Sequence, residues 1–71
     1  MEDWKVILMR FKYKKGDIVD CKLNFGSYRF RVCSVGKTFV GTIYYEVFDV
    51  NTGRRYTIKK DNLELNGKLL T

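Results

Sequence analysis

Histidine and proline are absent from this chain of 71 residues, and cysteine occurs only twice. Without histidine the chain lacks the usual agent of general acid–base catalysis, and two cysteines do not complete a zinc site. Cys33 has no activating partner that would make it a nucleophile. We therefore expect a protein that is not an enzyme and that holds no metal or cofactor. The absence of proline leaves every apolar segment free to form a strand.

Long apolar runs and acidic residues are also scarce. The longest apolar run, residues 6–9, is far shorter than the ~20 residues that span a bilayer. The first residues lack the basic leader and cleavage site of a secretory signal, so we expect a cytoplasmic protein with no membrane partner. Eight acidic residues stand against fourteen basic ones, a net charge of +6. Such a charge attracts polyanions such as nucleic acid, although it can also serve only to keep a small protein soluble.

Four segments of alternating apolar and polar residues lie between residues 14 and 65, separated by short loops rich in glycine and asparagine. This pattern is typical of a small antiparallel barrel with one buried and one wet face. Hairpins centred on the three loops predict one inner face, which consists of Val19, Cys21, Leu23, Tyr28, Phe30, Val32, Ile43, Tyr45, Val47, Tyr56 and Ile58. Residues 63–65 are expected to add a last strand that closes a five-stranded barrel.

The same centring predicts how the strands pair and where the cysteines point. The pairs are Cys21 with Phe30, Lys22 with Arg29, Val32 with Tyr45, and Tyr45 with Ile58. In this register Cys21 points inward and Cys33 outward, so we expect two free thiols and a reducing compartment.

The ends of the chain are expected to flank a single barrel domain at residues 14–66. Residues 1–13 form an N-terminal arm that packs on the barrel. Its apolar residues fit either a helical stripe or a strand, so an extra strand and a short helix both stay open. Residues 67–71 are assigned to a C-terminal tail. An uncovered edge strand or the arm could pair two chains, so we expect a monomer or a weak homodimer.

The predicted outer face is basic and carries two aromatic rings. In the expected register Lys22 faces Arg29, and this repulsion would be relieved by a polyanion, although long basic side chains can also splay into solvent. Exposed rings among basic residues can stack bases while the cations hold phosphates, unless the N-terminal arm covers them. The candidate nucleic-acid site consists of Lys22, Arg29, Arg31, Arg55 and Lys59 for phosphates, and of Tyr44, Phe48 or Phe25 for stacking.

The segments GDIVDCKL, YRFRVCSV, YYEVFDVNTGRRYTI and NLEL resemble those of SH3-like small barrels, most closely the Tudor branch, over residues 14–65. The Tudor resemblance implies an aromatic cage for methylated lysine or arginine at Phe25, Tyr28, Phe48 and Asn51. The sequence departs from that pattern at Val50, where the family usually has tyrosine. FKYKKG, VGK and TGR also bear a looser likeness to small basic crenarchaeal chromatin proteins, SH3-like barrels that bind DNA through a sheet face.

We therefore predict a non-catalytic module that binds DNA or RNA with little sequence specificity. The alternative is a protein-interaction module. One form would be a phage-type regulator that docks on a larger partner through its Phe25 and Phe48 end, and the other would be a Tudor-like peptide reader.

Overall fold

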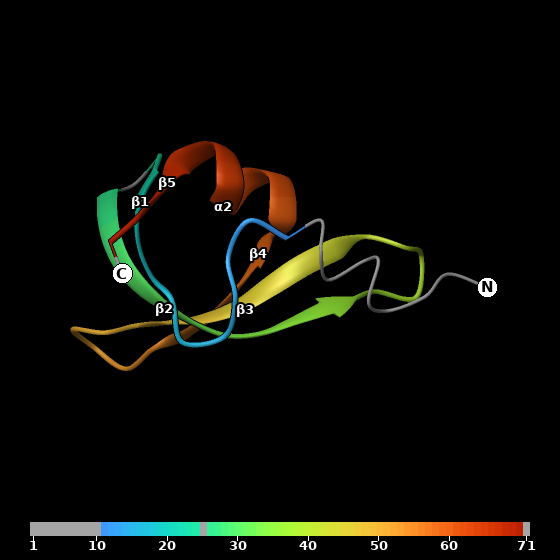
Figure 1. Cartoon of the computed structure of the whole chain (residues 1–71), viewed down its shortest axis with the longest axis horizontal. Helices are drawn as coiled ribbons and strands as arrows, with labels where there is room; N and C mark the ends of the chain where they lie inside the picture. Colours follow the sequence, from blue (N-terminus) through green and yellow to red (C-terminus); the bar gives the residue numbers. More distant parts are fainter. Residues whose placement is uncertain (1–10, 25, 71) are drawn as a thin grey trace.

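The computed structural model describes residues 11–24 and 26–70. These residues form, in order, β1 (Ile18–Leu23), β2 (Gly26–Lys37), β3 (Ile43–Asp49), β4 (Arg55–Lys59), α2 (Lys60–Asn66) and β5 (Gly67–Leu69). The strands make one antiparallel sheet in the order β4-β3-β2-β1-β5, so the predicted all-β antiparallel fold is confirmed (Figure 1). Within the described residues β4 and β5 do not pair with each other, so the sheet is not closed into the barrel that the sequence predicts.

The helix α2 lies where the predicted closing strand was expected. It contacts β1, β3, β4 and β5, and its Leu63 is completely buried. The prediction of a strand at residues 63–65 is therefore wrong: Leu65 is 81% exposed, although alternation would place it inward with Leu63. Lys60 and Glu64 form an ion pair one helical turn apart, which favours the helix. Residues 67–69, which the sequence assigns to a tail, form β5 and pair with β1.

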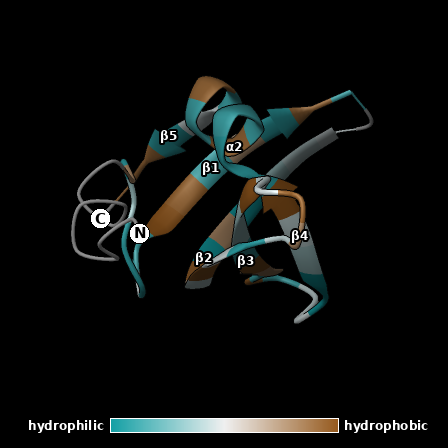
Figure 2. Cartoon of the chain, turned by 90° about the vertical axis from the view of Figure 1, so that its right-hand side faces the viewer, coloured by the Kyte–Doolittle hydropathy of each residue, from teal (hydrophilic) through white to brown (hydrophobic). Residues whose placement is uncertain are grey.

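The core lies between the curled sheet and α2, and apolar and polar bands alternate along the strands (Figure 2). Seven residues of the predicted inner face are buried: Val19, Cys21, Phe30, Val32, Tyr45, Val47 and Ile58. Leu23, Tyr28 and Tyr56 pack against them while partly exposed, whereas Ile43 is half-buried and lies outside this cluster. Tyr13, which comes from before the predicted strands, and Leu63, which lies on α2, complete the core.

The strand registers are partly as predicted. Tyr45 pairs with Ile58 as expected, but Val19 pairs with Phe30 and Val32 with Val47, each two residues away from the predicted partner. In the first hairpin the strands pair up to Leu23 and Gly26, which leaves a two-residue connection in place of the expected four-residue loop. Because side chains alternate with a period of two, a two-residue shift keeps the side chains of β2 on their predicted faces as far as Val32. A β-bulge between Val32 and Ser34 then exchanges the faces of β2, so that Ser34 lies opposite Glu46 and Val35 packs against the core.

Residues 11–13 bring part of the N-terminal segment to the core. The Phe11 ring meets the Tyr45 ring edge-on at 5.2 Å, and Tyr13 is only 2% exposed. Residues 1–10, for which an arm is predicted, lie outside the described residues. Across the described part of the chain no helix has the length and apolar character needed to cross a membrane.

Candidate nucleic-acid interface

The outer face of the sheet is the face opposite the core, and it carries all seven residues predicted to bind nucleic acid. The strands β2, β3 and β4 alternate between buried and exposed residues along this region, which places these side chains on one face. The five basic side chains are exposed, and the two rings are half-buried. They are Lys22 on β1, Arg29 and Arg31 on β2, Tyr44 and Phe48 on β3, and Arg55 and Lys59 on β4.

Three of these residues form a row across neighbouring strands, which we name the Phe48 row. Phe48 pairs with Arg31 on one side and with Arg55 on the other. Side chains directly opposite each other in an antiparallel sheet have Cβ atoms about 5 Å apart, so the ring of Phe48 has a cation on each side. Among the described residues neither arginine forms an ion pair, and both side chains are therefore available to an external anion.

Tyr44 and Lys59 form a second row, together with Gly36. The Tyr44 ring lies over Gly36 so closely that an added Cβ there would come within 2.6 Å of the ring's Cζ and hydroxyl oxygen. The absence of a side chain at Gly36 therefore lets the ring lie against β2. The two rows are separated along β3 by Glu46, which pairs with Ser34 and Thr57.

The predicted repulsion between Lys22 and Arg29 does not occur. The two-residue shift places Arg29 opposite Asp20, whose Oδ1 lies 3.1 Å from the arginine Nε, and Lys22 opposite Ser27. The Arg29 and Asp20 side chains are 53% and 45% exposed, so this ion pair contributes at most ~1 kcal/mol. Arg31 lies between Ile18 on β1 and Phe48 on β3. The Phe48 row therefore replaces the pair Lys22 and Arg29 as the main candidate for contacting nucleic acid.

The alternative cage is not assembled by its described members. Tyr28 stacks on Phe30 with ring centroids 5.4 Å apart, on the inner face, whereas Phe48 lies on the outer face. Asn51 lies in the turn after β3 and shares a groove with Tyr28 but not with Phe48. Phe25 lies outside the described residues.

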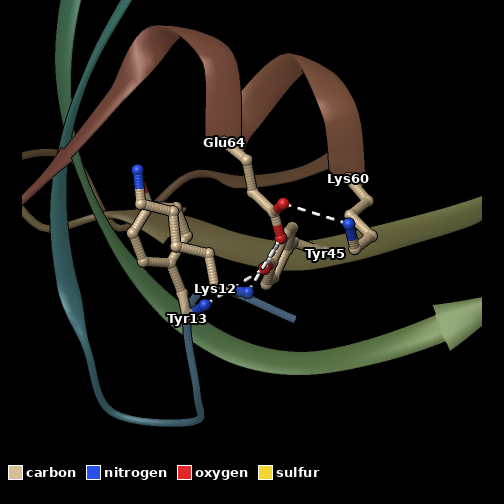
Figure 3. Close-up of polar contacts among 5 residues, drawn as sticks. All are labelled: Lys12, Tyr13, Tyr45, Lys60 and Glu64. Atoms are coloured by element: carbon tan, nitrogen blue, oxygen red, sulfur yellow. Dashed lines mark hydrogen bonds and ion pairs between the residues drawn. The ribbon is translucent and has the colours of Figure 1, made fainter. Parts of the chain in front are cut away.

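A partly buried polar cluster, which the sequence pattern does not predict, links α2, β3 and the N-terminal segment (Figure 3). The Tyr45 hydroxyl donates a hydrogen bond to Glu64 Oε2 and accepts one from the Tyr13 backbone N–H, at 3.2 Å. The Lys12 N–H also donates to Glu64 Oε2, and Lys60 Nζ lies 3.0 Å from Glu64 Oε1. Tyr45 is fully buried and the Lys60 and Glu64 side chains are 19% and 18% exposed, so this cluster ties α2 to the core.

The cluster shifts the pKa values of its members in opposite directions. Burial raises the pKa of Tyr45, and the hydrogen bond to Glu64 raises it further. Burial alone would raise the pKa of Glu64, but the hydrogen bonds from the Lys12 N–H, Tyr45 and Lys60 stabilise the carboxylate, and the net shift is downward. Burial likewise raises the pKa of the Tyr13 phenol. Of these contacts, only the Lys60–Glu64 ion pair could be predicted from the sequence, because its residues are four apart. Lys12, Tyr13 and Tyr45 are far from Glu64 along the chain.

Within residues 11–24 and 26–70 no group of three or more histidine, cysteine, aspartate or glutamate side chains could hold a metal ion. Comparison of the chain with protein-family models, with curated proteins and with solved structures finds no match.

Proposed function

We propose that this chain is an SH3-like module that binds nucleic acid with little sequence preference through the outer face of β2, β3 and β4. The observation that carries the proposal is the Phe48 row, in which a half-buried ring lies between Arg31 and Arg55. A ring of this kind stacks on a base of any identity, and the flanking cations hold the phosphates on either side. The return of β5 to the side of β1, after a short helix, supports the SH3-like resemblance.

The test is a titration of labelled single- and double-stranded DNA and RNA by fluorescence anisotropy over a range of salt concentrations. The variant Arg31→Glu/Arg55→Glu reverses both cations of the row. Its control, Lys14→Glu/Lys15→Glu, changes the net charge equally in the exposed turn before β1. We expect the first variant to lose affinity and to flatten the salt dependence by about 0.7 in log–log slope for each lost phosphate contact on a single strand. If the two variants lose the same affinity, binding depends on the net charge of the protein and not on the Phe48 row. If the first variant keeps its affinity, the proposal is overturned.

A second candidate function, docking on a protein partner, is favoured by the turn between β2 and β3. Phe39 is 105% exposed and Val40 84%, in the turn that joins β2 to β3 (Figure 1). The turn is well held: the Gly41 N–H donates to the Thr38 carbonyl at 3.0 Å, and Gly41 has φ of 92°. An ordered turn that presents two adjacent apolar side chains is a feature of contact sites. This observation moves the protein-binding alternative from the Phe25 and Phe48 end to the turn.

Mutations distinguish nucleic-acid binding from docking on a protein partner. The variant Phe39→Ser/Val40→Ser changes no charge and lies outside the Phe48 row, so its affinity for nucleic acid should equal that of the unmodified protein. Loss of a co-purifying protein with this variant, and its retention with Arg31→Glu/Arg55→Glu at high salt, would support docking through the turn.

A further inference from the structure

A hollow of about 180 Å³ lies beside the Phe48 row, and the proposed function does not use it. Its polar lining comes from Cys33, Glu46, Arg55 and Thr57, on β2, β3 and β4. The volume is below the 300–1,000 Å³ usual for small-molecule sites, so the hollow suits one ring system and not a larger ligand. Because Arg55 belongs both to the hollow and to the Phe48 row, a group bound here is continuous with the proposed nucleic-acid site.

The carboxylate of Glu46 is held in place by a β-bulge. The register of β2 against β3 shifts between Val32 and Ser34, which sets Ser34 opposite Glu46. The Ser34 hydroxyl then donates to Glu46 Oε2 at 2.8 Å. Bulges of this kind re-aim side chains beside binding sites. The shift therefore fixes the carboxylate through one oxygen.

The other oxygen of that carboxylate has no partner among the described residues, although cations lie on both neighbouring strands. The ion pairs in the described part of the chain are Asp20–Arg29 and Lys60–Glu64, so Glu46 belongs to none. A carboxylate accepts hydrogen bonds only, at about four lone-pair positions, and Ser34 uses one of them. Glu46 is thus an oriented acceptor within a basic face, where it repels phosphates unless it binds something else.

We propose that Glu46 selects guanine in single-stranded nucleic acid bound on this face, an inference that rests on the proposed function. The Watson–Crick edge of guanine presents two adjacent donors, N1–H and the N2 amine, which match the two oxygens of one carboxylate. The N3–H of thymine or uracil lies between two carbonyl oxygens, which a carboxylate repels. In a duplex the Watson–Crick edge is occupied by the partner base, so the edge is readable only in a single strand. Arg55 then holds the phosphate of the same nucleotide.

The test uses three single-stranded probes of equal length: thymine alone, thymine with isolated guanines, and the same probe with inosine in place of guanine. Inosine lacks only the N2 amine, so the last two probes differ by one donor. We expect the unmodified protein to bind the guanine probe about tenfold tighter than the inosine probe, as is usual for a paired base contact. The thymine probe should bind most weakly.

The variant Glu46→Gln and the control Asp20→Asn each remove one negative charge from the outer face. We expect Asp20→Asn to strengthen binding of all three probes equally and to keep the preference for guanine. Glu46→Gln should strengthen binding of the thymine probe and abolish the difference between guanine and inosine. Ser34→Ala, which only frees the carboxylate, should reduce that difference without changing the charge.

The outcomes separate the inference from the function on which it rests. If Glu46→Gln strengthens binding of every probe as Asp20→Asn does, Glu46 acts by its charge alone and the inference is overturned while nucleic-acid binding stands. An unmodified protein that binds the guanine and inosine probes equally overturns it too. If no probe binds at low salt, the proposed function fails, and the inference fails with it.

Discussion

The Tyr45 hydroxyl on β3 donates a hydrogen bond to the Glu64 carboxylate on α2, across the open side of the sheet. Glu64 also accepts a hydrogen bond from the Lys12 backbone N–H, 52 residues earlier in the chain. Three distant segments therefore meet at one carboxylate. Since the sheet itself is not closed, this contact and the burial of Leu63 are what hold α2 over the core.

The first prediction concerns the two buried tyrosines of this region. Tyr45→Phe leaves the Tyr13 backbone N–H without its acceptor and removes one of the three donors to Glu64, and a buried donor left unpaired costs about 1–3 kcal/mol. Tyr13→Phe is the control, because the Tyr13 hydroxyl is buried and has no hydrogen-bond partner among the described residues. We expect this second variant to be as stable as the unmodified protein or more so. Urea denaturation measures both, and equal losses in the two variants would contradict the role given to the Tyr45 hydroxyl.

The second prediction concerns the dependence of stability on pH. The pKa of Glu64 is lowered in the folded state from its ordinary 4.5, by its hydrogen-bond donors acting against the effect of burial. A lowered pKa contributes stability that is present above the unfolded value and is lost as the pH falls through the folded value. The pKa of Tyr45 is raised above 10.0 by burial, so its contribution is present below that pH and is lost as the pH rises above it.

The free energy of unfolding should therefore decline below about pH 4.5 and again above about pH 10, with the middle of the range flat for these two groups. Glu64→Gln keeps the shape of the side chain and removes its titration. Denaturant unfolding at a series of pH values should show a shallower acid decline in this variant. If Glu64→Gln loses stability at acid pH as steeply as the unmodified protein, the acid decline is due to other carboxylates.

The third prediction concerns the two thiols. Cys21 is 1% exposed and burial raises its pKa, whereas Cys33 is half-buried beside the β-bulge. Since the thiolate is the reactive form, we expect a thiol reagent to modify Cys33 alone in the folded protein and Cys21 only after unfolding. Cys33→Ser should remove the fast reaction completely. Fast modification of two thiols would mean that β1 opens readily.

The sequence predicted the faces of the strands better than their pairing. Alternation alone determines which side chains point inward, and most of the predicted inner face is buried or packed on the core. Register depends on the turns. The short connection after Leu23 displaces it by two residues without changing any face, whereas the bulge before Ser34 displaces it by one and reverses the faces of the rest of β2.

The elements outside the alternating segments were the least predictable. Leu63 and Leu65 are two residues apart, as in a strand. The helix is favoured by the Lys60–Glu64 spacing and by the tertiary hydrogen bonds of Glu64 with Tyr45 and Lys12, and alternation does not show these hydrogen bonds. The same limit applies to the site. Alternation placed Arg31, Phe48 and Arg55 on one face, and the predicted pairing of Tyr45 with Ile58 also sets Phe48 beside Arg55. The place of Arg31 in the row follows from the β2–β3 register, which the sequence did not predict.

The fourth prediction couples Gly36 on β2 to Tyr44 on β3. A Cβ at position 36 would lie 2.6 Å from the Tyr44 ring, so Gly36→Ala forces the ring away from the sheet. Only the far end of a half-buried side chain has to move, and we expect a stability loss of about 1 kcal/mol. In a Tyr44→Ala background no ring is present to be displaced, so the same substitution should cost close to nothing, giving a coupling energy of about 1 kcal/mol. A double-mutant cycle by urea denaturation measures this coupling, and additive losses would show that the ring does not lie over Gly36. The cycle also bears on the interface: if Tyr44 stacks on bases, Gly36→Ala should weaken nucleic-acid binding even though it changes no charge and removes no side chain from the outer face.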